Sequence, residues 1–280
     1  MREFHFPDAA FDARLTLLDS AQAFHWQEWD GSYIAVSGGV PMRVTQLDAG
    51  IVVDAPEGCS EAFLRRYFDL DRDYSVIVRE YGDCPCAEEA FTRLPGLRIL
   101  RQPAWEALCT FLLSQNNNTA RIGKLVRAMC TRYGARVEAF GREIYAFPEP
   151  EALSSAGAEA LRALGCGYRA EYLAGTAQMV LEGFPLEELA DMPYEDAREK
   201  LMELPGVGPK VADCVLLFGC GHLSAYPVDV WVARLSRAWL GIEGKTSRAL
   251  ADNARARFGP HAGILQQYLF HCARCGLIET

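Results

Sequence analysis

Lysine is scarce in this sequence, and there is no excess of positive charge. The 280 residues include only four lysines, Lys124, Lys200, Lys210 and Lys245, and the formal net charge is −9 with a sequence pI near 5.2. This balance argues against a generally basic nucleic-acid-binding chain. It leaves room for a local positive patch built mostly from arginine, whose guanidinium stays charged and can fork onto phosphate or base edges.

The sequence also lacks an apolar run long enough to cross a bilayer. The segment Met1 to Pro7 carries an acidic residue and no signal-peptide core, so we expect no export and no membrane association. Half of the residues are hydrophobic, which is ample for one large or two modest cores. A cytoplasmic chain follows as the expectation.

Closely spaced cysteine ligand sets are missing as well. There are ten cysteines, but the only close pairs are Cys84-Pro-Cys86 and Cys272-x-x-Cys275, and neither has a second pair at zinc-like spacing. A chain of this length without a signal peptide is not a typical disulfide scaffold. We therefore expect reduced thiols and no metal site.

Short apolar runs separated by turn dipeptides occupy the first part of the chain. The dipeptides Asp30-Gly31, Gly38-Gly39 and Ala49-Gly50 are typical of tight hairpin turns, so the runs predict an antiparallel meander. The predicted strands are 15–18, 24–29, 33–36, 42–47 and 51–53. Two helices are expected after them, at 60–70 with Ser60 as cap and at 73–81, where the segment 82–86 ends the second.

Helical periodicity dominates from residue 101 onward. The predicted helices are 104–115, 119–133, 158–164, 168–181, 194–203, one beginning at Pro209, 228–240, 246–258 and 260–275. The sequence therefore predicts an α+β fold, with an N-terminal antiparallel sheet domain and flanking helices at 1–98. A mainly helical domain of two subdomains is expected at 99–280.

A short glycine turn joins two predicted helices at 204–210. Gly206 and Gly208 allow the backbone to turn tightly, and Pro209 suits the first position of the following helix. Backbone N–H groups at such a turn and helix start form a phosphate cradle. The pattern is a helix-hairpin-helix, a module that grips a nucleic-acid backbone without reading sequence.

Two residues suggest chemistry in addition to binding. Lys210 lies in the first helical turn, where the positive end of the helix dipole disfavours an ammonium and favours a nucleophilic amine. Asp229 follows a proline at the start of a later predicted helix. Alone, Asp229 would be interpreted as an N-cap. A catalytic carboxylate is the better interpretation when Asp229 occurs in Pro-Val-Asp after the hairpin segment Leu204-Pro-Gly-Val-Gly-Pro-Lys-Val-Ala-Asp-Cys.

These residues resemble the helix-hairpin-helix DNA glycosylases with a Gly/Pro-rich loop and a closing aspartate, the HhH-GPD superfamily. In that family the aspartate marks a glycosylase, and the hairpin lysine marks a bifunctional enzyme that also cuts the strand. Further segments resemble the 8-oxoguanine branch, bacterial type, over the whole chain: 20–26, 100–102, 114–122, 164–170 and 259–263. Some relatives hold an iron–sulfur cluster on four C-terminal cysteines, a run that this chain lacks, so no cluster is expected.

The resemblance implies which residues face the strand opposite the lesion. Asn116, Arg121 and Arg169 match the family's readers of the opposite cytosine, whose acceptor edge requires amide and guanidinium donors. Tyr168 falls where the family inserts an aromatic wedge into the duplex. Taken singly, the asparagines would suit a capped loop and Tyr168 a packed helix.

The resemblance also implies a base pocket. Gln266 and Phe270 match a base-edge reader and a stacking ring, and Cys214 matches the residue covering the other face of the base. Without the match, Phe270 and Cys214 would be read as core. The family reads the N7–H of 8-oxoguanine with a glycine carbonyl.

Here the residue that matches this glycine is Ala21, which less readily adopts positive φ and puts the geometry in question. Trp231, where many relatives have histidine, and Phe218, where some have methionine, suggest a repacked pocket wall.

The expected function is a bifunctional DNA glycosylase/AP lyase that excises 8-oxoguanine opposite cytosine by base flipping and a lysine Schiff base. No metal or redox cofactor is implied, although the hairpin carbonyls could hold a structural monovalent cation as relatives do. The expected partner is double-stranded DNA containing 8-oxoguanine, bound by a bacterial, nucleoid-associated monomer. The alternatives are a glycosylase for alkylated bases or oxidised pyrimidines, and a non-catalytic DNA-binding module.

Overall fold

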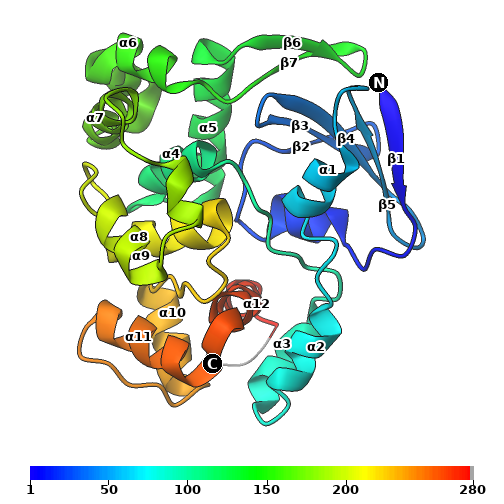
Figure 1. Cartoon of the computed structure of the whole chain (residues 1–280), viewed down its shortest axis with the longest axis vertical. Coiled ribbons are helices and arrows are strands. Elements are labelled where there is room, and N and C mark those ends of the chain that lie inside the picture. Colours follow the sequence, from blue (N-terminus) through cyan, green and yellow to red (C-terminus); the bar gives the residue numbers. More distant parts are fainter. Residues whose placement is uncertain (278–280) are drawn as a thin grey trace.

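The computed structural model describes residues 1–277 and has a sheet on one side and a helical body on the other (Figure 1). This arrangement confirms the predicted α+β class. Within the described residues, no helix is both long and apolar enough to cross a membrane.

Five antiparallel strands form the sheet in the order β1-β5-β4-β3-β2. Their bounds are β1 Arg2–Phe6, β2 Gln27–Trp29, β3 Ser32–Ser37, β4 Val40–Gln46 and β5 Ile51–Ala55. The predicted meander from β2 to β5 is confirmed, and its turns place Gly31 and Gly39 at positive φ. Alternate residues such as Met42, Val44 and Val53 are fully buried, so one face packs on the core.

The expected strand at 15–18 is wrong. Leu15–Asp19 is a short helical turn, and the Asp12 carboxylate accepts the Leu15 backbone N–H at 2.8 Å, which satisfies a donor at its start. A short apolar run such as 15–18 fits a buried helical turn as well as a strand. The edge strand β1 was not predicted.

Three helices connect the sheet to the body: α1 Glu61–Tyr67, α2 Tyr74–Glu80 and α3 Pro85–Arg93. Ser60 and Asp73 cap the first two through their side chains, as expected for the start of each helix. The predicted break at 82–86 is shorter than expected, since the unpredicted helix α3 already begins at Pro85, which fits a first helical position. The buried faces of α2 and α3 pack in the core of the helical body, where α3 lies against α12.

The helical body comprises nine labelled helices within the described chain. They are α4 Ala104–Ser114, α5 Thr119–Tyr133, α6 Pro150–Leu161, α7 Arg169–Leu181, α8 Tyr194–Leu201, α9 Pro209–Val215, α10 Val230–Ala238, α11 Ser247–Phe258 and α12 Ala262–Arg274. All were predicted, but α6 begins at Pro150 and not at residue 158. An unpredicted hairpin, β6 Arg136–Ala139 and β7 Arg142–Tyr145, packs Ile144 against Ile34 and Val36 of β3.

Buried polar contacts fasten the sheet to the body. The Glu106 carboxylate on α4 accepts the Ser37 hydroxyl at 2.6 Å and the Gly38 backbone N–H at 2.7 Å. On the other side, the Gln267 side chain of α12 donates to the Ser20 carbonyl at 2.7 Å. These contacts fix the segment around residues 20–24 next to α12, where the cavity described next lies.

Candidate active site

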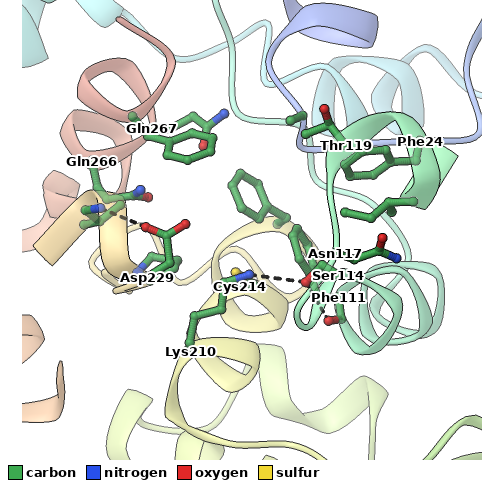
Figure 2. Close-up of a pocket in the computed structure, with 16 residues that line it drawn as sticks. Phe24, Phe111, Ser114, Asn117, Thr119, Lys210, Cys214, Asp229, Gln266 and Gln267 are labelled. Atoms are coloured by element: carbon green, nitrogen blue, oxygen red, sulfur yellow. Dashed lines mark hydrogen bonds between the residues drawn. The ribbon is translucent and has the colours of Figure 1, made fainter. Parts of the chain in front are cut away.

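A cavity of about 140 Å³ lies where α4, α9, α10 and α12 meet the segment after residue 19 (Figure 2). An apolar cavity of about 150 Å³ is large enough to hold a benzene ring. Seven residues predicted from the sequence line it: Ala21, Lys210, Cys214, Phe218, Asp229, Gln266 and Phe270. The fold therefore brings together residues that are far apart in the chain.

The helix-hairpin-helix is present as α8, a glycine turn and α9. Gly206 has a φ of 75°, and a Cβ there would lie 2.3 Å from the Tyr172 ring. A glycine is therefore required at 206 on both backbone and steric grounds. Gly208 is the N-cap of α9 in an extended conformation, with open space around the position of a Cβ.

A buried polar network holds the two hairpin helices together. The Tyr194 hydroxyl of α8 donates to the Asp213 carboxylate of α9 at 2.6 Å, and the Arg198 guanidinium lies 3.1 Å from the same oxygen. All three side chains are buried. Because a buried carboxylate with two such donors fixes the register of the helices, it also fixes where α9 begins.

Lys210 lies in the first turn of α9, and its side chain reaches the cavity (Figure 2). The ammonium nitrogen Nζ donates to the Ser114 hydroxyl at 3.3 Å and lies 5.4 Å from the centre of the Phe111 ring. Both partners come from α4. The amine is thus held at the cavity wall and does not point away into solvent.

Asp229 lines the same cavity as Lys210 and caps α10 (Figure 2). Its Oδ1 accepts the Val232 backbone N–H at 2.8 Å. Within residues 1–277, no ion pair of 4.0 Å or less joins Asp229 to Lys210. The N-cap and catalytic interpretations are therefore compatible, because the capping contact uses one carboxylate oxygen only.

Gln266 places an unsatisfied acceptor in the cavity wall. The side chain is 4% exposed, and its Oε1 has no hydrogen-bond partner in the described structure. A buried polar atom without a partner carries a free-energy cost, which a ligand with an N–H donor would relieve. Phe270 lies one helical turn further along α12 and also lines the cavity.

Cys214 and Phe218 form the wall on the α9 side. Burial raises the pKa of the Cys214 thiol to about 11, against the opposing effect of Lys210, so the residue is a neutral thiol near pH 7. The Phe218 ring stacks on Phe111 with centroids 5.3 Å apart. The wall is therefore neutral and largely apolar.

Ala21 adopts a φ of 58°, in the left-handed region that favours glycine. Alanine was expected to resist this conformation, but Ala21 adopts it. The neighbouring residues hold the backbone in place, since Gln22 and Ser20 are both fully buried and hydrogen-bonded. The backbone geometry is kept despite the side chain. The strain costs on the order of 1–2 kcal/mol.

The prediction that Trp231 lines the base pocket is wrong. The indole is 57% exposed, and the next residue, Val232, lines the cavity instead. Successive helical residues point about 100° apart, so the first turn of α10 turns Trp231 outward when Val232 faces inward. The Arg234 guanidinium lies 5.8 Å from the centroid of the indole ring.

The asparagine loop between α4 and α5 is exposed and joined to α7. Asn116 has a φ of 46°, and its side-chain amide donates to the Tyr168 hydroxyl at 3.1 Å. Tyr168 is 46% exposed and meets Tyr172 edge to face. Asn118 caps α5 by accepting the Arg121 N–H, so the capped-loop interpretation holds for that asparagine.

The two predicted arginines differ in accessibility. Arg121 is exposed, and its guanidinium donates weakly to the Gly165 carbonyl at 3.4 Å. Arg169 is 5% exposed, and its guanidinium donates to the backbone carbonyls of Gln115 and Asn116. In this conformation Arg169 supports the loop from beneath, and Arg121 is free to face a ligand.

Sequence reasoning missed nine residues that line the cavity: Phe24, Phe111, Ser114, Asn117, Thr119, Ile122, Pro227, Val232 and Gln267. Phe111, Ile122 and Val232 belong to apolar helical stripes that look like ordinary core. Ser114 begins the segment 114–122 that resembles the family, but nothing in the sequence assigned it a role. Within the described residues, no group of three or more His, Cys, Asp and Glu side chains could hold a metal ion.

Two family models match the chain. The model described as "HhH-GPD superfamily base excision DNA repair protein" matches residues 109–260, and "8-oxoguanine DNA glycosylase, N-terminal domain" matches residues 4–108. A protein of Methanothermobacter thermautotrophicus named "Probable N-glycosylase/DNA lyase" is 29% identical over 91% of this chain and 90% of its own.

Solved structures are similar over nearly the whole chain. MBOgg1 in complex with a low-affinity DNA ligand has a TM-score of 0.90 at 35% identity, covering 97% of this chain and 94% of its own. The Clostridium acetobutylicum 8-oxoguanine glycosylase/lyase, with double-stranded DNA carrying cytosine opposite 8-oxoguanine, has a TM-score of 0.88 at 30% identity. That match covers 96% of this chain and 94% of the other.

Proposed function

Since the chain belongs to the HhH-GPD superfamily of base excision DNA repair proteins, we propose that it is a DNA N-glycosylase with AP lyase activity acting on 8-oxoguanine in duplex DNA. The observation that carries the proposal is the cavity, whose wall contains both the Lys210 amine and the Asp229 carboxylate. A base must leave the helical stack to enter such a cavity.

The everted base is held by its edge and its faces. The Gln266 amide, whose Oε1 lacks a partner, pairs with N–H groups of the purine Watson–Crick edge. Phe270 and the neutral Cys214 thiol contact the two faces. At the far edge, the Ala21 carbonyl accepts the N7–H that 8-oxoguanine has and guanine lacks, which accounts for discrimination between the two bases.

Lys210 acts as nucleophile. Its neutral amine forms a bond to C1′ as the bond from C1′ to the base nitrogen breaks, and the base departs with the bonding electron pair and takes up a proton. The Asp229 carboxylate stabilises positive charge that develops on the sugar. Loss of a proton and opening of the sugar give a Schiff base, and elimination at the 3′ phosphate nicks the strand. Hydrolysis then frees the amine.

Contacts to the duplex are assigned to exposed residues beside the cavity. We assign Tyr168 as the wedge and Asn116 with Arg121 as readers of the opposite cytosine, because these side chains lie at the surface of one loop pair. Arg169 could contact the cytosine only after it breaks its hydrogen bonds to the backbone carbonyls of Gln115 and Asn116. The N–H groups at Gly206 and Gly208 would bind phosphate, and a monovalent cation at the hairpin carbonyls remains part of the proposal.

Borohydride trapping on an 8-oxoguanine·cytosine duplex tests the proposal. The wild-type protein should give a covalent protein–DNA adduct, and Lys210→Gln should give none and still bind the duplex. A matched control, Lys200→Gln, changes a lysine that pairs with Glu203 on the exposed side of α8 and should trap normally. An adduct in the Lys210→Gln variant would show that another amine is the nucleophile.

Single-lesion duplexes test the substrate. We expect cleavage of 8-oxoguanine opposite cytosine to exceed cleavage opposite the other three bases and to exceed that of alkylated purines or oxidised pyrimidines. Faster release of an alkylated base would place the chain with the alkylation enzymes of the same superfamily. Binding of the duplexes without base release or strand nicking would identify the protein as a non-catalytic DNA-binding module.

A further inference from the structure

The Ser114 hydroxyl accepts a hydrogen bond from the amine in the cavity, and the Cys214 thiol is a second neighbour of that amine. Ser114 is the last residue of α4, and its Oγ accepts a hydrogen bond from Lys210 Nζ at 3.3 Å. The two residues are 96 positions apart in sequence, so the contact exists only because α4 packs against α9. Figure 2 shows this bond at the cavity wall.

The direction of the bond is set by a second contact of Ser114. A serine hydroxyl has one hydrogen and two lone pairs. Its hydrogen is donated to the Phe111 carbonyl at 2.7 Å, so toward Lys210 the oxygen can only accept. The amine must therefore direct an N–H at Ser114, whether it is neutral or protonated.

This direction determines where the lone pair of the neutral amine can point. One N–H is fixed on Ser114, and the Phe111 ring lies 5.4 Å from Nζ on the α4 side. Both contacts lie on the wall, and Asp229 lines the same cavity (Figure 2). With one N–H directed at the α4 wall, the lone pair of a neutral amine takes one of the other positions on the nitrogen, which point away from that wall.

We propose that Ser114 is a positioning residue that aims the nucleophilic amine of Lys210 into the cavity. The inference rests on the proposed glycosylase function and adds a residue to the same site. Because a small misplacement of a nucleophile can lower a rate by as much as about a hundredfold, the effect should appear in the covalent step. DNA binding should be largely unaffected, since Ser114 is not on the exposed loop.

Single-turnover kinetics on an abasic-site duplex tests this role, because that substrate isolates Schiff-base formation from base release. Ser114→Ala should trap with borohydride roughly tenfold more slowly than wild type, with affinity for an uncleavable abasic analogue within about twofold. Ser114→Thr keeps the hydroxyl and should recover the rate to within about threefold. Thr92→Ala, which removes an exposed hydroxyl donating to the Glu88 carbonyl, controls for loss of a helical back-bond and should trap normally.

The outcomes separate this inference from the function beneath it. Wild-type trapping in Ser114→Ala, or a threonine variant as slow as the alanine variant, would overturn the positioning role alone. An equal fall in rate and affinity, or a melting temperature well below that of Thr92→Ala, would assign Ser114 to structure and also overturn it. If the wild-type protein gives no adduct, the proposed function itself fails.

Discussion

Asp229 combines two roles in one side chain, and they can be separated by substitution. Asparagine caps a helix about as well as aspartate, so Asp229→Asn keeps the contact with the Val232 N–H and removes only the charge. We expect base excision to slow by roughly 10²–10³-fold because charge stabilisation in the transition state is lost. Single-turnover excision assays measure this, and melting temperature and duplex affinity should change little.

The matched variant Asp229→Ala removes both roles. It should lose the same activity and, in addition, about 1 kcal/mol of stability, which denaturant unfolding would detect. A large loss of stability in the asparagine variant, with near-normal excision, would mean that Asp229 is a structural cap only.

Ala21 offers a residue-scale test of backbone strain. The left-handed conformation costs alanine roughly 1–2 kcal/mol, and glycine at this position would remove that cost. Glycine also makes the unfolded chain more flexible, which lowers stability by about 0.5–1 kcal/mol. Ala21→Gly should therefore raise the free energy of unfolding by about 0.5–1 kcal/mol in urea titration. Ala23→Gly, at a buried position without positive φ, should instead lower it.

Within one element, the hairpin, two glycines have different requirements. Gly206→Ala places a methyl group into the Tyr172 ring at positive φ and should cost about 2–4 kcal/mol in unfolding experiments. Gly208→Ala meets open space in an extended conformation and should cost less than about 1 kcal/mol. Because the added methyl lies where a phosphate would approach, duplex affinity should fall in this variant, and unchanged affinity would argue against phosphate contact at 208.

Elements with local signals could be predicted from the sequence. The helix 119–133 was predicted at its true bounds because Asn118 caps its start, and β3 to β5 followed from turn glycines between β-branched runs. β6 and β7 could not be found, because their residues are mostly polar and their pairing depends on packing over β3. The division between domains at 98/99 stays a prediction.

Physical reasoning on the hairpin turn and the later Pro-Val-Asp singled out Lys210 and Asp229, and the structure places both at the cavity with Gln266. Motif matching with the family supplied Gln266 and the remaining site residues. It misplaced Trp231, because the phase of α10 decides which side chain faces inward. It could not reveal Ser114, whose contact with Lys210 depends on the packing of helices distant in sequence.

For the molecule as a whole, the joint between sheet and body should respond to pH. Burial raises the pKa of the Glu106 carboxyl to about 7, against the opposing hydrogen bonds from Ser37 and Gly38. The folded chain thus keeps a proton that the unfolded chain releases near 4.5. The contribution of Glu106 to stability is full below pH 4.5 and is lost as pH rises to 7.

His25, with its Nε2 3.9 Å from Glu106, acts in the opposite sense. Burial lowers the pKa of His25 to about 4, so its contribution is lost as pH falls from 6.5 to 4. In Glu106→Gln the contribution of Glu106 is removed and that of His25 is retained. The stability of this variant relative to wild type should rise by about 2–3 kcal/mol between pH 4.5 and 7.

Urea unfolding at several pH values measures that difference. Glu151→Gln, which alters an exposed carboxylate in the first turn of α6, should run parallel to wild type across the range. Parallel curves for Glu106→Gln as well would mean that Glu106 is ionised in the folded protein over this interval.

Ala21 and Phe24 reach the cavity from the sheet side, whereas Lys210, Asp229 and Gln266 reach it from the helical body. The joint itself is thus part of the receptor. A helical body expressed alone would keep its amine and carboxylate but lack the Ala21 carbonyl, which we propose accepts the N7–H of the base. A change in the cavity-lining residues of either half should therefore alter which base the cavity accepts.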